Sequence, residues 1–144
     1  MRALIDTCVI IDALQNREPF CESAKSIFLS VANKQLEGYI SASSITDIYY
    51  IIHRSTHNNA RTRQILKTLL GLFGILDTAA LDCRKALSSE ISDYEDAVMC
   101  ETAERCDMDC LITRNQKDYA PSKVKICSPE EVLRELESPN GPNK

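Results

Sequence analysis

Long apolar runs are absent from the 144 residues of this chain, so no segment reaches the about 18 apolar residues that a membrane-spanning helix requires. The N-terminal residues meet an acid at Asp6 and lack the apolar stretch and cleavage site of a signal peptide. The seven cysteines are an odd number without a C-x-x-C pair, which argues against a zinc ribbon or a disulfide framework. We therefore expect a cytoplasmic protein with reduced cysteines and no membrane association.

An excess of basic residues is also absent. The 17 Lys and Arg residues are outnumbered by 21 Asp and Glu residues, which gives a formal net charge of -4. A protein that holds nucleic acid by phosphate neutralisation alone has a basic surface, and this composition does not predict one. A polyanionic ligand would therefore need another source of attraction, and a metal ion held by clustered carboxylates would supply it.

Short apolar segments alternate with amphipathic segments along the whole chain. The predicted strands span 2–5, 38–42, 74–78, 109–113 and 124–128, and the helices between them include one over 58–70 that Gly71 and Gly74 end. This alternation predicts the α/β class, with a central parallel sheet covered by helices on both faces in three layers. We expect one domain over residues 1–137 and a disordered tail over 138–144.

Acidic residues occur where the carboxyl ends of parallel strands are expected, which is where open sheets bind ligands. Asp6 follows the first strand and Asp47 opens the helix after the second. Asp93 and Asp96 begin the helix before the fourth strand, and Asp118 follows that strand. Converging carboxylates favour a hard divalent cation and phosphodiester chemistry, whereas separate ones would serve as helix caps.

Four sequence blocks carry a resemblance to a known family. In chain order they read LIDTCVIID, SSITDIYYII, DYEDAVMCETA and LITRNQKDY, and KICSPEEVL follows them. Their order and separation resemble those of the PIN-domain nucleases, particularly the bacterial branch of VapC-like toxins. The resemblance covers about residues 2–133.

The resemblance implies a parallel sheet in the order 3-2-1-4-5 and an endoribonuclease that depends on Mg²⁺ or Mn²⁺ and cleaves single-stranded or loop RNA. The implied catalytic residues are Asp6, Asp47, Asp96 and Asp118, and the implied metal ligands are Asp6, Asp47, Asp93, Asp96, Asn115 and Asp118. Two positions depart from the family pattern. This chain has Asp47 where many members have Glu, and Asn115 where some have Asp.

Several partners are also implied. Arg114 and Lys117 flank the predicted site and are candidates for RNA-phosphate contacts, although either could instead pair with Asp118. A toxin of this family would bind a small antitoxin, and the apolar group Tyr49–Ile52 would bury either a homodimer interface or a core helix. The alternatives are a catalytically inactive PIN-fold scaffold, an RNA- or protein-binding module, and a receiver-like domain in which Asp77 accepts a phosphoryl group.

Overall fold

A five-stranded parallel sheet forms the centre of the computed structural model, which describes residues 1–138. The strands are β1 (Arg2–Ile5), β2 (Glu37–Ser41), β3 (Gly74–Leu76), β4 (Cys110–Ile112) and β5 (Ile126–Cys127). The helices are α1 (Thr7–Leu14), α2 (Cys21–Ala32), α3 (Ala42–Thr56), α4 (Asn59–Leu72), α5 (Ala80–Ala86), α6 (Tyr94–Arg105) and α7 (Pro129–Glu137), with a 3-10 helix η1 (Gln116–Tyr119). The strand order β3-β2-β1-β4-β5 confirms the predicted topology.

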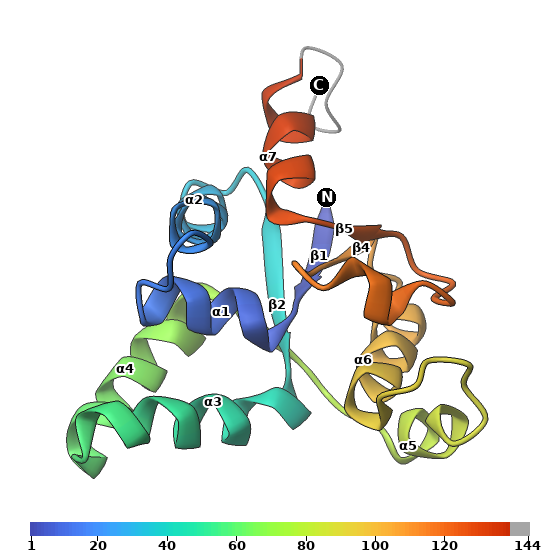
Figure 1. Cartoon of the computed structure of the whole chain (residues 1–144), viewed down its shortest axis with the longest axis horizontal. Coiled ribbons are helices and arrows are strands. Elements are labelled where there is room, and N and C mark those ends of the chain that lie inside the picture. Colours follow the sequence, from blue (N-terminus) through green and yellow to red (C-terminus); the bar gives the residue numbers. More distant parts are fainter. Residues whose placement is uncertain (139–144) are drawn as a thin grey trace.

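Two hydrophobic cores lie on opposite faces of the sheet, because successive side chains of a strand point to opposite faces. In β1, Ala3 and Ile5 belong to the core shared with α1 and α2, whereas Leu4 belongs to the core shared with α6. All three side chains are fully buried. Figure 1 shows the resulting layers, with α1, α2, α3 and α4 on one side of the central strands and α5 and α6 on the other.

The central position of β1 determines where the functional groups gather. Its neighbours are β2 on one side and β4 on the other, with Ile5 opposite Ile112. The chain leaves β1 at Asp6, whose backbone N–H donates to the carbonyl of Ile112 at 2.9 Å. The carboxyl ends of β1 and β4 are therefore held side by side, together with the first turn of α1.

Most predicted element boundaries agree with the structure to within a few residues, but the end of one helix was predicted wrongly. Gly71 does not end the helix, because α4 continues to Leu72 and Phe73 then takes the extended conformation that leads into β3. Gly71 is exposed and a side chain there would meet nothing within 4 Å, so it lies in the helix without a packing role.

Two other expectations concern the ends and the surface of the chain. Among the described residues, no helix is both long and apolar enough to cross a membrane. Apart from Ser138, the tail expected over 138–144 lies outside the described residues. All seven cysteines are free thiols, as predicted, and four of them are buried.

Candidate functional site

Asp6 lies at the junction of β1 and α1 and is 7% exposed. It occupies the N-cap position of α1, but its carboxylate makes no capping hydrogen bond to that helix. Oδ2 instead accepts a 2.7 Å hydrogen bond from Oγ1 of Thr113 and a 3.4 Å contact from the thiol of Cys8. Thr113 is itself fully buried at the end of β4, so the neighbouring strand fixes the orientation of the Asp6 carboxylate.

Asp96 lies in the first turn of α6, where the hydroxyl of Tyr119 donates a 2.9 Å hydrogen bond to its Oδ1. Burial, together with the nearby carboxylates of Asp6, Asp93 and Asp118, raises the pKa of Asp96 to about 6. The Tyr119 hydrogen bond opposes this shift. A carboxyl group with a raised pKa close to other acids marks a place where a cation would be stabilising.

Asp6 and Asp96 line the same groove, whose volume is about 750 Å³. The groove runs between α3 on one side and α5 and α6 on the other, and Asp47 lines it from α3. Within residues 1–138, no protein group donates a hydrogen bond to Oδ1 of Asp6 or to Oδ2 of Asp96. Each carboxylate thus has one oxygen bound by the protein and one left for a ligand.

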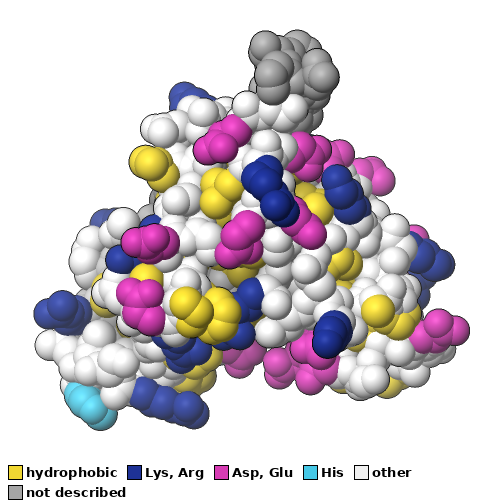
Figure 2. All heavy atoms as spheres, turned by 45° about the horizontal axis from the view of Figure 1, so that its top comes forward, with side chains coloured by type: hydrophobic (Ala, Val, Ile, Leu, Met, Phe, Trp, Pro, Cys, Tyr) yellow, Lys and Arg dark blue, Asp and Glu magenta, His cyan; other side chains and the backbone are white. Residues whose placement is uncertain are grey.

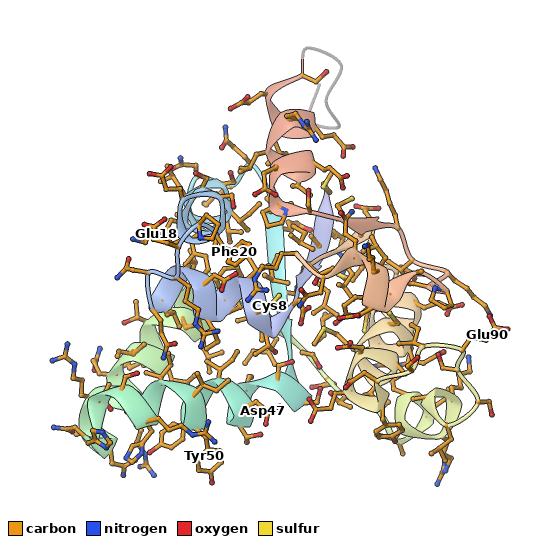
Figure 3. The ribbon with its side chains drawn as sticks, in the orientation of Figure 1. Cys8, Glu18, Phe20, Asp47, Tyr50 and Glu90 are labelled. Carbon is orange, nitrogen blue, oxygen red and sulfur yellow. The ribbon has the colours of Figure 1, made fainter. Side chains whose placement is uncertain are left out.

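The other predicted metal ligands lie on α3, at the start of α6 and after β4. Asp47 is exposed at the rim of the groove, and Figure 3 shows it on α3, which is separate from the start of α1 where Cys8 lies. The side chain of Asp93 caps α6 by accepting a 3.0 Å hydrogen bond from the N–H of Asp96. Asn115 and Asp118 are exposed after β4. In the part of the chain that the structure describes, no three His, Cys, Asp or Glu side chains converge as a metal cluster.

Arg114 does not pair with Asp118, which was one of the two roles expected for it. Its Nε donates to Oδ2 of Asp12 at 2.7 Å, and its guanidinium lies over the ring of Phe20 at 4.3 Å from the centroid. Asp12 is 1% exposed, and a buried carboxylate is stabilised by a nearby group of opposite charge, which Arg114 supplies. Lys117, the other candidate for RNA contact, is exposed on η1.

Sequence reasoning did not find two hydrogen-bonded pairs, Arg114 with Asp12 and Tyr119 with Asp96. The sequence does indicate a partner for Asp12, because an acid within the apolar segment VIIDAL is expected to need a buried cation. The sequence does not indicate the partner of Tyr119, because Asp96 lies 23 residues earlier on a separate element.

The donor set fits a hard divalent cation. Mg²⁺ is usually bound by one or two carboxylates and keeps several waters, with substrate phosphates completing its shell. Asp6 and Asp96 supply two such carboxylates at the bottom of an open groove, each with a free oxygen. A two-carboxylate site of this kind leaves ligand positions open for water and phosphate.

Solved structures with the same fold include several toxin-antitoxin assemblies. A toxin-antitoxin complex from Klebsiella pneumoniae is 26% identical, with a TM-score of 0.64, and the match covers 88% of this chain and 97% of that chain. DNA-bound VapBC from Salmonella typhimurium is 16% identical, with a TM-score of 0.68 and coverage of 90% and 98%. VapBC2 from Rickettsia felis, bound to a promoter DNA fragment, is 17% identical, with a TM-score of 0.65 and coverage of 89% and 98%.

A comparison of the sequence with curated proteins found no match. A comparison with models of protein families found the PIN domain, matched over residues 2–117. This segment contains β1, the groove and both carboxylates of the central pair, together with Thr113. Since the match spans well over half of the sequence, the chain belongs to the PIN domain family.

Proposed function

We propose that this protein is an endoribonuclease that hydrolyses RNA phosphodiester bonds with Mg²⁺ or Mn²⁺. The observation that carries the proposal is the pair Asp6 and Asp96, two carboxylates in one groove, each held by a buried hydroxyl and each with a free oxygen. PIN domains are generally nucleases and generally use divalent metals, which supports the same conclusion.

In this proposal Asp6 and Asp96 would hold the cation, and Asp47 would add a third carboxylate from the rim of the groove. A bound divalent cation lowers the pKa of a coordinated water and neutralises charge on the reacting phosphate. Thr113 and Tyr119 keep the two carboxylates oriented toward the groove. Asn115 and Asp118, which are exposed after β4 and do not line the groove, are further candidate ligands, and Lys117 on η1 would contact the RNA backbone.

The surface charge explains why a cation is central to the proposal. Figure 2 shows Lys and Arg side chains interspersed with Asp and Glu over the face that it draws, with no single basic field. The acids in the groove would repel the phosphates of RNA, so substrate binding requires their charge to be neutralised. A cation held by these acids would therefore both attract the RNA phosphates and take part in the hydrolysis.

We further propose that the protein is the toxin of a toxin-antitoxin pair, neutralised by a small protein. The support is the likeness to the Klebsiella pneumoniae toxin-antitoxin complex over 88% of this chain. Copurification of the chain with the product of a neighbouring small gene tests this. Inhibition of RNA cleavage by that product is the expected result, and full activity in its presence would contradict it.

Calorimetric titration of Mn²⁺ into the metal-free protein tests the proposed site, with the Asp96→Asn variant in parallel. We expect binding to the wild type that is lost in the variant, and cleavage of single-stranded RNA by the wild type alone. Attack by water would leave a 5′-phosphate and a 3′-hydroxyl, which end-labelled products would reveal. Full cleavage by Asp6→Asn or Asp96→Asn would overturn the site. Wild-type protein that binds neither Mn²⁺ nor RNA would favour an inactive scaffold.

A further inference from the structure

The side of α3 that lines the groove carries an acidic, an aromatic and a basic side chain, in that order along the helix. Asp47, Tyr50 and Arg54 line the groove at spacings of three and four residues, which place them along one face of the helix. With a rise of about 1.5 Å per residue, they span about 10 Å along the helix axis. An acid near the central carboxylates is thus followed by an aromatic ring and then by a cation.

Tyr50 is unusually accessible for an aromatic side chain. It is 63% exposed, whereas its neighbours Ile48 and Ile52 are buried in the core. The apolar group expected on this helix is therefore divided between core and surface, and Tyr50 is its most exposed member. Figure 3 shows Tyr50 on the same side of α3 as Asp47.

The ring of Tyr50 also packs against the ring of the preceding residue, Tyr49. The contact is T-shaped, with ring centroids 5.5 Å apart and planes at 86°. Tyr49 is itself stacked on His53 at 5.8 Å and donates a hydrogen bond to Asn59 of α4. An exposed ring that is already ordered loses little conformational entropy when a flat ligand stacks on it.

We propose that Tyr50 and Arg54 form a nucleotide platform, on which an unpaired nucleobase next to the cleaved bond stacks on Tyr50 while a neighbouring phosphate binds Arg54. Unpaired bases stack on aromatic rings, and arginine binds phosphate with two parallel hydrogen bonds. A base within a duplex is stacked on its neighbours and does not offer its face to the ring. The nucleotide platform therefore selects single-stranded RNA at the cleavage point.

The composition of the groove favours RNA over a second copy of the chain as the occupant. An interface between copies would bury a mainly apolar core with few charges. Here the exposed ring lies between Asp47 and Arg54, and a second exposed aromatic residue, Tyr94, lines the opposite wall at 46% exposure. An alternation of rings with a cation is typical of sites that follow a single strand.

The test rests on the proposed ribonuclease function and compares Tyr50→Leu with Tyr50→Phe. Both variants keep an apolar side chain, but only phenylalanine keeps the ring. With a labelled single-stranded RNA and Mn²⁺, we expect Tyr50→Leu to raise KM by about 5- to 150-fold, since stacking contributes about 1–3 kcal/mol per base. Tyr50→Phe should restore wild-type KM, and kcat should change little in both variants.

Arg54→Gln should also raise KM, and this increase should shrink as salt is added, because phosphate contacts are screened. Arg63→Gln on α4 is the matched control, since Arg63 is exposed but does not line the groove. Equal KM for wild type, Tyr50→Leu and Arg54→Gln would overturn the nucleotide platform while leaving the ribonuclease proposal intact.

Two other outcomes would also be decisive. If Tyr50→Leu converts a dimer into a monomer in light scattering without changing KM, Tyr50 serves an interface between copies and the nucleotide platform is wrong. If the wild type neither cleaves nor binds the RNA, both proposals fail together.

Discussion

The hydroxyl of Tyr119 reaches from η1 to Oδ1 of Asp96 on α6, at 2.9 Å. Tyr119 is fully buried, and burial together with the nearby carboxylates raises the pKa of its hydroxyl. The tyrosine is therefore a neutral donor at any working pH, and its hydrogen bond stabilises the ionised form of Asp96. The relationship makes Tyr119 a positioning residue for a candidate metal ligand.

Replacement of Tyr119 by Phe removes this donor while keeping the ring in the core. We expect Mn²⁺ affinity at neutral pH to fall by about 10-fold, which is typical of losing a group that orients a metal ligand. Calorimetry measures the affinity, and thermal unfolding checks that the fold is kept. The matched control is Tyr94→Phe, because the Tyr94 hydroxyl lines the groove but donates to the carbonyl of Cys83. Equal affinities for both variants would contradict the role of Tyr119.

Replacement of Asp96 by Asn should stabilise the metal-free protein at neutral pH. The pKa of Asp96 is raised to about 6 in the folded state, so the unfolded chain binds fewer protons between about pH 4 and pH 6. Stability is therefore lost as the pH rises through that window, and the neutral amide avoids this loss. We expect a gain of about 1–2 kcal/mol at pH 7.5 after solvent screening.

Urea unfolding of wild type and Asp96→Asn at pH 4 and pH 7.5 measures this difference. The gain should be largest at pH 7.5 and should disappear near pH 4, where the wild-type carboxyl is protonated. Exposed Glu95→Asn is a suitable control, since Glu95 lies beside Asp96 on the groove wall. A gain that does not depend on pH would show that the buried charge of Asp96 is not its cause.

Loss of Arg114 should affect the fold more than RNA binding. Arg114→Gln leaves the buried carboxylate of Asp12 without its cation, so we expect a loss of about 2–4 kcal/mol of unfolding free energy. The double variant Asp12→Asn with Arg114→Gln should recover part of this loss because no charge is then left unpaired. Chemical denaturation measures the unfolding free energies of the single and the double variant. Unchanged stability with an increased KM for RNA would instead assign Arg114 to the substrate.

The ion pair of Asp82 and Arg105 should contribute to stability on the other face of the sheet. Burial raises the pKa of Asp82, but the guanidinium of Arg105, the N–H of Ala79 and the hydroxyl of Thr102 outweigh it and lower that pKa overall. We expect Asp82→Asn to cost about 2–4 kcal/mol at neutral pH, with the difference shrinking as the pH falls below the ordinary aspartate range.

Urea titrations at neutral and acidic pH measure the difference in unfolding free energy between wild type and Asp82→Asn. Glu104→Gln, at an exposed position of α6, is the control. A lowered carboxyl pKa means that the unfolded chain takes up protons first as the pH falls, so wild-type stability should decline toward the acid range. Equal stability of Asp82→Asn and wild type at pH 7 would show that the ion pair contributes nothing net.

The sequence predicted what depends on local pattern and on resemblance to the PIN family. The alternation of segments predicted the sheet and its layers, and Asp6 and Asp96 were predicted to share one edge, where both line the groove. The pairing of Arg114 with Asp12 was not predicted, because the two residues are 102 positions apart. The extension of α4 through Gly71 was also missed, since helix propensity alone does not show that packing of Leu69 and Phe73 continues the helix.

The pairing of β1 with β4 has a consequence for protein synthesis. Asp6 is synthesised 107 residues before Thr113, which orients it, and Tyr119 follows later still. A nascent chain that has not yet released β4 lacks one neighbour of its central strand and the donors to both carboxylates. The groove therefore cannot take this form before β4 and η1 have been synthesised, so a product that terminates before β4 lacks the donors to both carboxylates. A fragment that ends at Cys106 should accordingly bind no Mn²⁺, which calorimetry would show.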